Sequence, residues 1–266
     1  IISSVGEGVM DFKVGQSVAF FMGFGAFAEK IVVPAELAFP IPKELPHSVA
    51  AGIFMVYGTS YHALVQRANI GKNDEVLVLG AAGGVGLAAV DIAKSFGARV
   101  VAAVSTKEKA EVCAGYGVDD IVVYGEKKLD KDGQRALTKE LKSKSVRGGY
   151  SIIYDPVGDC FAEPALRSVG WGGTYLVVGF AAGKIPSFPT NLMLLKGCAV
   201  SGVFIGRFQK EEPEKNVQNF LEIGRLLAKG KLNPMVSETI RMEDSVAAIE
   251  RIAKRGVVGK VVFVND

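Results

Sequence analysis

The chain has 266 residues, of which 49% are apolar and 22% charged, and its 31 basic and 28 acidic residues give a formal net charge of +3. Disordered chains are poorer in apolar residues and richer in charge, so the composition predicts a globular protein long enough for two domains. The small surplus of positive charge gives no reason to expect a nucleic-acid partner. The uncharged run Val76–Val90 is shorter than the roughly 20 apolar residues of a membrane span, so no span is predicted.

Candidate metal ligands are scarce. The three cysteines lie far apart, form no Cys-x-x-Cys pair, and are accompanied by only two histidines. An odd number of cysteines is typical of a reducing compartment, so we predict a cytoplasmic protein without a metal site. The chain opens without Met on the strand-like segment Ile1–Val5, so we expect its natural N-terminus to be missing, which leaves organelle targeting open.

Residues 1–46 are predicted to be strand-like and rich in turns. Apolar runs at 17–22 and 26–33 flank a Gly-Phe-Gly turn at 23–25. The prolines that follow keep the chain extended and outside any helix, which makes this segment a predicted domain boundary. These prolines are Pro34, Pro40, Pro42 and Pro46.

From residue 75 onward, strands and helices are predicted to alternate. Apolar runs separated by helical stretches indicate βαβ units and a parallel sheet buried on both faces. The predicted strands are 75–79, 99–104, 121–124, 150–154, 174–178, 199–204, 235–240 and 260–264. The predicted helices are 85–96, 106–115, 133–143, 213–229 and 243–254.

The run from Leu79 to Ala89, Leu-Gly-Ala-Ala-Gly-Gly-Val-Gly-Leu-Ala-Ala, carries a nucleotide-binding pattern. Gly84, Gly86 and Ala89 match the Gly-x-Gly-x-x-Gly/Ala fingerprint of the first βα turn in dinucleotide-binding folds. Small residues let the backbone approach a pyrophosphate, and the helix N-terminus offers N–H groups to the phosphates. The alternative is a tight strand-to-helix turn without a ligand. The predicted strand before the run and the helix after it favour nucleotide binding.

The end of the second predicted strand favours NADPH over NADH. Proteins that bind NAD carry Asp or Glu there, about 20 residues past the glycines. This chain has Ser105-Thr106-Lys107-Glu108-Lys109. A hydroxyl with neighbouring lysines suits a 2′-phosphate, which an acid would repel. The alternative interpretation is that Ser105 or Thr106 caps a solvated helix, and the two interpretations are compatible.

Several motifs follow one another in a fixed order along the chain. They are Val5–Val9, Phe12–Val18, Gly25–Glu29, Gly58–Leu64, Ala81–Gly86, Tyr154–Gly158, Val178–Phe180, Asn191–Lys196, Gly206–Phe208 and Gly259–Val262. Some are common individually, but in this order they are specific. The sequence thereby resembles the medium-chain dehydrogenase/reductase superfamily, in its zinc-free quinone oxidoreductase branch.

The resemblance implies an α/β protein with two domains. Residues 57–195 would form a Rossmann domain with a doubly wound parallel sheet. Residues 1–56 and 196–266 would form a GroES-like β-rich domain, incomplete at its N-terminus. NADPH would lie in the cleft, where open α/β sheets bind their ligands. A homodimer would form through the edge of the Rossmann sheet near residues 199–204.

The resemblance also implies which residues contact the cofactor. The pyrophosphate would be held by Gly83, Gly84, Val85 and Gly86, and the 2′-phosphate would be surrounded by Ser105, Lys109 and Tyr124. The nicotinamide would be lined by Gly179, Phe180, Ala181, Val203 and Phe204, and the mouth of the cleft would contain Thr59.

Without zinc, the implied reaction is hydride transfer from the nicotinamide to a quinone or an α,β-unsaturated carbonyl, whose conjugation spreads the developing negative charge. Such an enzyme orients the two partners and donates a hydrogen bond to the developing oxyanion. Tyr57 is the candidate donor, and a packed aromatic residue is the alternative. Arg207 would meet an anionic group of the substrate or a carboxylate of a partner chain.

Three other polar residues are predicted to have structural roles: His62 as a satisfied histidine in a helix, His47 in a surface loop, and Asp155 fixing a turn before Pro156. Because a fold does not determine a function, a second hypothesis stays open. It is a nucleotide-binding protein of the same fold with a redox-sensing or structural role.

Overall fold

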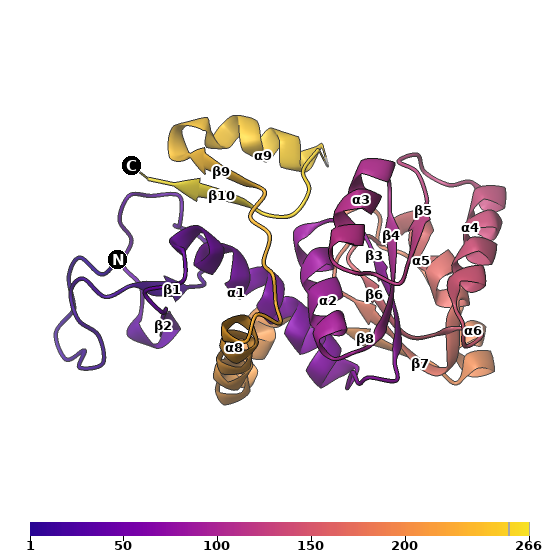
Figure 1. Ribbon diagram of the computed structural model, residues 1–266, viewed down its shortest axis with the longest axis horizontal. Helices are drawn as coiled ribbons and strands as arrows, with labels where there is room; N and C mark the ends of the chain where they lie inside the picture. Colours follow the sequence, from indigo (N-terminus) through magenta and orange to yellow (C-terminus); the bar gives the residue numbers. More distant parts are fainter. Residues whose placement is uncertain (255, 266) are drawn as a thin grey trace. The chain divides into compact units, whose positions relative to one another are not determined.

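The computed structural model describes residues 1–254 and 256–265, which form two compact units (Figure 1). Unit 2 is the continuous segment Tyr57–Asn233, and unit 1 combines residues 1–56 with the chain from Pro234 onward. The first boundary coincides with the one expected between residues 56 and 57. The second lies between residues 233 and 234 instead of between 195 and 196.

Unit 2 is built on a six-stranded sheet with the order β5-β4-β3-β6-β7-β8, in which every neighbouring pair is parallel. Counted from the first strand of the unit, this order is 3-2-1-4-5-6, the order of the Rossmann fold. The predicted fold class is therefore confirmed. The strands are β3 (Glu75–Leu79), β4 (Arg99–Val104), β5 (Asp120–Val123), β6 (Tyr150–Asp155), β7 (Val169–Val177) and β8 (Ala199–Gly202).

Helices cover both faces of this sheet. Helices α2 (Gly84–Ser95) and α3 (Lys107–Gly115) lie on one side, and α4 (Lys131–Lys144) and α5 (Asp159–Arg167) on the other (Figure 1). All five residues of β3 are buried, which explains why this strand is an almost continuous apolar run in the sequence.

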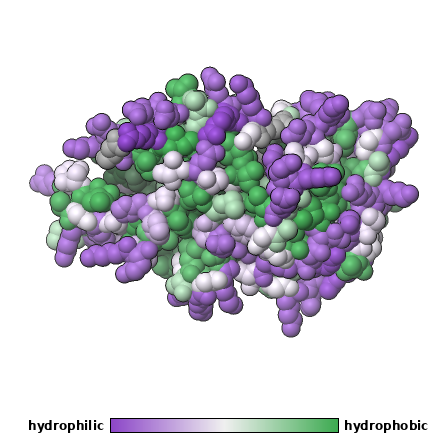
Figure 2. All heavy atoms as spheres, turned by 45° about the horizontal axis from the view of Figure 1, so that its top comes forward, coloured by the Kyte–Doolittle hydropathy of each residue, from purple (hydrophilic) through white to green (hydrophobic). Residues whose placement is uncertain are grey.

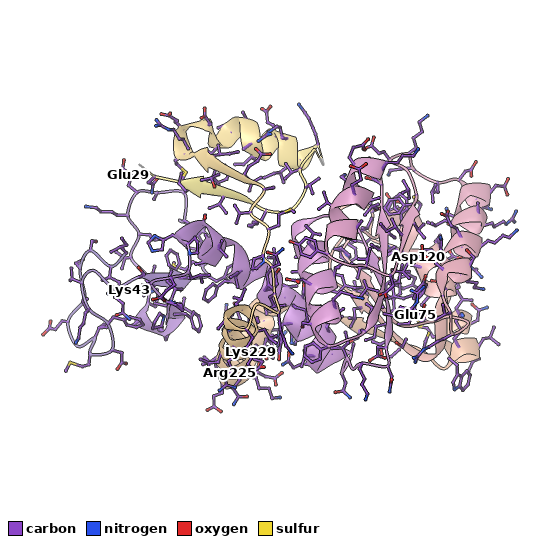
Figure 3. All side chains as sticks on the ribbon, viewed as in Figure 1. Glu29, Lys43, Glu75, Asp120, Arg225 and Lys229 are labelled. Carbon is purple, nitrogen blue, oxygen red and sulfur yellow. The ribbon has the colours of Figure 1, made fainter. Side chains whose placement is uncertain are left out.

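Acidic residues fasten the loops at the amino-terminal edge of the sheet. Figure 3 labels Glu75 and Asp120, the first residues of β3 and β5. The fully buried Glu75 carboxylate accepts hydrogen bonds from the Ser145 hydroxyl at 3.0 Å and the Val146 N–H at 3.1 Å. Asp120 forms an ion pair with Lys144 at 2.9 Å. The opposite, carboxyl-terminal edge is the one to which the predicted site residues belong.

Residues 196–233 belong to the Rossmann unit and not to the predicted GroES-like domain. Strand β8 runs parallel to β7, with Ala199 opposite Thr174, and this backbone pairing completes the sheet. The remaining helices of this part of unit 2 are α6 (Thr190–Lys196), α7 (Ile205–Glu211) and α8 (Pro213–Ala228). The prediction missed α5, α6 and α7.

A long apolar helix contains the first boundary. Helix α1 (His47–Tyr61) continues into the π-helix η2 (His62–Arg67). These 21 residues are long and apolar enough to cross a membrane, and 67% of the most apolar window is buried inside the protein. Core helices of globular proteins pass the same test. The helix His47–Arg67 is a different segment from the uncharged run Val76–Val90. The predicted cytoplasmic location stays a prediction.

Unit 1 contains two separate pairs of strands. β1 (Val18–Phe20) is antiparallel to β2 (Ala38–Pro40), and β9 (Glu238–Arg241) is parallel to β10 (Val261–Val264). Its other elements are η1 (Ala35–Leu37), η3 (Met242–Asp244) and α9 (Ser245–Ala253). The predicted run 26–33 contains no strand. The GroES-like assignment of this unit stays a prediction.

Candidate functional site

The predicted cofactor residues gather at one edge of the Rossmann sheet. In a parallel sheet the carboxyl ends of the strands all meet at the same edge, which is where such folds bind ligands. All the predicted cofactor residues except Thr59 follow the ends of five strands. Gly83–Gly86 follow β3, Ser105 and Lys109 follow β4, Tyr124 follows β5, Gly179–Ala181 follow β7, and Val203 and Phe204 follow β8.

The turn after β3 depends on three glycines. Gly80 adopts a φ of 56°, in the left-handed region that favours glycine. Gly83 caps α2 with extended backbone and no capping side chain. A Cβ on Gly86 would lie 2.3 Å from the Gly80 carbonyl oxygen and 2.8 Å from the Ala81 Cα, so only glycine fits where α2 packs on the turn.

Gly80 takes the conformation of a tight turn and Gly86 allows the close packing of helix on strand, two of the roles that glycines have in the dinucleotide fingerprint. The sequence pattern placed the fingerprint at Gly84, Gly86 and Ala89, and of these only Gly86 is one of the three glycines of the turn. Gly84 and Ala89 lie inside α2. Gly80 is the residue that the pattern missed. The sequence does contain a signal for it, because a glycine recurs every three residues at 80, 83 and 86.

The first turn of α2 suits an anion. Its N-cap offers no side-chain acceptor to the free N–H groups, and the positive end of the helix dipole lies there. The Ser60 hydroxyl donates to the Val85 carbonyl at 2.9 Å and pairs with the buried Tyr154 hydroxyl at 2.8 Å. This chain of hydrogen bonds holds the start of α2 against the end of β6.

The structure brings Ser105 and Lys109 together after β4. The Lys109 Nζ donates to the Ser105 hydroxyl at 3.1 Å, and the Thr106 hydroxyl caps α3 by accepting from the Lys109 N–H at 3.3 Å. Thr106 is thus the N-cap of α3, and the Ser105 hydroxyl pairs with Lys109; the 2′-phosphate site stays a prediction. Tyr124 packs its ring 4.7 Å from Phe161.

An acid lies on the same turn. The exposed Glu108 has a lowered pKa because its carboxylate accepts from its own backbone N–H at the start of α3 and from the Thr106 side chain. A carboxylate here is the kind of group that holds the ribose hydroxyls of NADH. The turn after β4 therefore carries both a lysine and an acid.

Asp155 organises the loop at the end of β6. Its buried carboxylate accepts from the N–H groups of Val157 at 2.7 Å and Gly158 at 2.9 Å, and from the Tyr175 hydroxyl. Burial raises the pKa of Asp155, and burial with the neighbouring carboxylate raises that of Tyr175. Asp155 therefore fixes a turn, as its structural interpretation predicted. Gly158 and Asp159 follow with positive φ values of 70° and 52°.

The segment after β7 is held by backbone hydrogen bonds to that loop. The Asp155 carbonyl accepts from Gly179 at 3.3 Å, and the Pro156 carbonyl accepts from Ala181 at 3.0 Å. A Cβ on Gly158 would lie 3.1 Å from the Phe180 ring, which is 39% exposed. Gly179, Phe180 and Ala181 are thereby held at the carboxyl edge of β6, between the ends of the strands.

The residues after β8 differ in exposure. The Val203 N–H donates to the Val177 carbonyl at 2.9 Å and its side chain is buried, whereas Phe204 is 71% exposed. Arg207 forms an ion pair with Glu211 on its own helix at 3.2 Å. That local partner gives no support to a substrate role for Arg207, which stays a prediction.

Tyr57 has a buried partner. Its hydroxyl donates to the Asp91 Oδ2 at 2.7 Å, and burial together with that carboxylate raises its pKa. This geometry favours the packed aromatic over the hydrogen-bond donor to substrate. Thr59 is buried as well.

The two histidines have different surroundings. His62 is buried and stacks on Phe208 with ring centroids 3.9 Å apart. Its Nδ1 has no hydrogen-bond partner among the described residues, so it is not the fully satisfied histidine that was predicted. His47 is exposed as predicted but is the first residue of α1 and not part of a loop, and its Nε2 lies 3.1 Å from the Ser17 hydroxyl.

No group of three or more His, Cys, Asp or Glu side chains that could hold a metal ion occurs within residues 1–254 and 256–265. Cys113 is fully buried, and that burial raises its thiol pKa to about 12.

The strand order and the glycine turn define a Rossmann-type nucleotide-binding protein. The family model described as zinc-binding dehydrogenase matches residues 84–222. Quinone oxidoreductase-like protein 2 of Bos taurus is 33% identical over 273 residues, covering 99% of this chain and 73% of the relative. A homolog of that protein from Nematostella vectensis is 32% identical over 265 residues, covering 98% and 70%.

A mycobacterial protein solved in complex with NADPH superposes with a TM-score of 0.89 at 26% identity, over 99% of this chain and 80% of that one. The chain belongs to the medium-chain dehydrogenase/reductase superfamily, in its quinone oxidoreductase-like branch. It is accordingly an oxidoreductase of the NAD(P)-dependent class.

Proposed function

We propose that this protein is an NADPH-dependent reductase of quinones or α,β-unsaturated carbonyls that works without zinc. The observation that carries the proposal is the gathering of the glycine turn, the Ser105–Lys109 pair and the Gly179–Ala181 segment at one edge of a parallel sheet. The mycobacterial structure with NADPH supports the cofactor.

The three groups of residues match three parts of a dinucleotide. The bare N–H groups at the start of α2 would hold the pyrophosphate. Lys109 would pair with the 2′-phosphate while the Ser105 hydroxyl donates to it. Gly179, Phe180 and Ala181, anchored on the end of β6, would form the wall beside the nicotinamide. A half-exposed aromatic ring such as Phe180 offers a flat apolar surface to that ring.

The bound nicotinamide supplies the hydride. The residues of this chain bind and orient the two reactants, and this positioning removes much of the entropic part of the barrier. A quinone or enone fits a site without zinc, because its own conjugation accommodates the negative charge that a metal would otherwise stabilise. The scarcity of His and Cys in the sequence supports this choice.

The experiment is a comparison of NADPH and NADH affinity by fluorescence titration in four proteins: wild type, Lys109→Ala, Glu108→Gln and Lys107→Ala. We expect Lys109→Ala to weaken NADPH binding at least about tenfold and to leave NADH binding within about twofold, because one charge-assisted bond to the 2′-phosphate is lost. Lys107→Ala is the matched control, with the neighbouring lysine removed.

Glu108→Gln tests the competing acid. If the Glu108 carboxylate serves the ribose of NADH, this variant weakens NADH binding and overturns the preference for NADPH. Equal weakening of both cofactors by Lys109→Ala also contradicts the proposal. Turnover with a panel of quinones and enones then separates the enzyme from a nucleotide-binding protein without activity, which would bind NADPH and reduce none of them.

The proposal includes a homodimer through strand β8. Within the described residues this strand pairs on one side only, and the nearby helix α6 exposes Leu194 and Leu195. Sedimentation equilibrium measures the mass in solution, and a monomer at all concentrations would exclude the pairing.

A further inference from the structure

Unit 2 begins at Tyr57 and ends at Asn233, and both residues are bonded to the same atom of helix α2. The Tyr57 hydroxyl donates to the Asp91 Oδ2 at 2.7 Å, and the Asn233 backbone N–H donates to the same oxygen at 2.6 Å. Asp91 is buried, with 8% of its surface exposed. One carboxylate oxygen thus joins the two points at which the chain passes between the units.

Asn233 is held from a second direction. Its carbonyl accepts from the Tyr116 hydroxyl at 2.7 Å, and Tyr116 is the C-cap of α3. Most backbone groups in proteins bond to other backbone groups. Here side chains from two different elements satisfy both backbone groups of the last residue of the unit, which fixes its position and direction before Pro234.

This arrangement has a cost in free energy. Burial raises the pKa of Asp91, and burial together with the Asp91 charge raises the pKa of Tyr116 to about 12. A buried carboxylate stays charged only because its donors compensate for the lost water, and an apolar side chain would avoid that cost. The two donors converge on a single oxygen, which points to positioning and not to packing as the task of Asp91.

Helix α2 connects this oxygen to the nucleotide site. The helix begins at Gly84, beside the glycine turn, and Asp91 lies about two turns further along it. The Ser60 hydroxyl, from the same helix as Tyr57, bonds to the Val85 carbonyl in the first turn. Helices α1 and α2 are therefore joined at both ends of this stretch.

We propose that Asp91 is a positioning residue that fastens both ends of unit 2 to the helix beginning at the glycine turn. A nucleotide bound at that turn consequently steadies the two points where the chain enters and leaves the unit. The fastening stands on the geometry alone, whereas the response to a nucleotide rests on the proposed function.

The fastening is tested without a nucleotide. Amide hydrogen exchange is measured by NMR in the whole chain for wild type, Asp91→Asn and Ser95→Ala. We expect the Asn233 amide to exchange at least about tenfold faster in Asp91→Asn, because the charged acceptor is lost. The Ser95 hydroxyl bonds locally to the Ile92 carbonyl at 2.7 Å, so Ser95→Ala on the same helix is the matched control and leaves Asn233 unchanged.

Tyr57→Phe keeps the ring and removes only the hydroxyl, so it serves if Asp91→Asn does not fold. We expect it to speed exchange of the amides at 58–61 at least about threefold. Unchanged exchange at Asn233 in Asp91→Asn, or at 58–61 in Tyr57→Phe, overturns the fastening.

The response to a nucleotide is tested by adding NADPH. In wild type we expect the Asn233 amide to become at least about threefold more protected. In Asp91→Asn we expect NADPH affinity to change less than about threefold while Asn233 no longer responds. Binding without any response at Asn233 in wild type overturns the coupling. No binding of NADPH overturns the proposed function and with it the coupling, while the measurements without nucleotide still decide the fastening.

Discussion

In unit 2 each of the four central strands has a hydrogen-bonded partner on both sides, whereas in the part of unit 1 that the structure describes the strands pair only in twos. The cores differ accordingly. Strand β3 is buried throughout, while in unit 1 the exposed fractions of Met10, Phe24 and Val32 are 87%, 84% and 91%. Figure 2 shows apolar surface, in green, among the hydrophilic side chains of the molecule. Isolated pairs of strands are marginal in water, and three or more with a buried face are needed for independent stability.

Unit 2 has the larger continuous core. Large apolar side chains of α4, α5 and the strands form one continuous cluster that includes Leu77, Leu141, Ile153 and Leu166. Unit 1 buries mostly smaller pieces, among them Ala50, Ile53 and Val261. We therefore expect the two units to open with different free energies, and three measurements test this difference.

The largest expected effect is in hydrogen exchange. Amides of β3 and β6 should exchange at least about a thousandfold more slowly than those of β1 and β2, because the first group opens only when the Rossmann core unfolds. Native-state exchange followed by NMR measures both groups in one sample. Equal protection would show that a single cooperative transition covers both units and would abolish the distinction.

The second effect concerns one glycine from each unit. Gly86→Ala should lower the free energy of unfolding of unit 2 by about 3 kcal/mol or more, because the new Cβ would meet the Gly80 carbonyl oxygen and the Ala81 backbone. Gly6→Ala in unit 1 should change stability by less than about 0.5 kcal/mol, since nothing lies within 4 Å of its Cβ position. Urea denaturation followed by circular dichroism measures both. A small effect of Gly86→Ala would show that the turn can relax.

The smallest expected effect concerns His62, the buried histidine of unit 2. Burial lowers the pKa of His62, because it disfavours the charged ring, so the folded protein binds this proton at lower pH than the unfolded chain. The folded protein therefore keeps its full stability with respect to His62 above the unfolded-state pKa of about 6.5, where the ring is neutral in both states. Stability is lost as the pH falls from there towards the folded-state pKa, because the unfolded chain takes up the proton first.

Unfolding free energies between pH 5 and 8 for wild type and His62→Gln should therefore show a shallower dependence on pH in the variant. Identical slopes in the two proteins would mean that His62 is not buried in the neutral form.

The predictability of the fold follows the same division. The predicted strands 75–79 and 99–104 coincide with β3 and β4, because strands buried on both faces appear in the sequence as nearly continuous apolar runs. In unit 1 the expected strand at 26–33 is absent, and β2 forms instead at 38–40, with Pro40 as its last residue. Short strands with one partner give only a weak hydrophobic pattern in the sequence. The helices α6 and α7, with seven residues each, are too short to show a helical period.

The site was predictable where it depends on strand ends and not where it depends on distant partners. Ser105 and Lys109 followed from their places after a strand, whereas Gly179 was implied by the resemblance to the family. Gly80 was missed because its conformation is defined by φ and by Val157 at the end of another strand. The partners of Asp91 lie 34 and 142 residues away in the sequence, a separation that no local pattern reports.

The shared oxygen of Asp91 also bears on how the two ends of unit 2 could be joined. Because the Tyr57 side chain and the Asn233 backbone bond to the same oxygen, the two ends of unit 2 are separated by little more than the length of a tyrosine side chain. A short peptide that spans this length would close the ends with little loss of loop entropy. We therefore expect circular permutants joined at Tyr57 and Asn233 to retain the fold of unit 2.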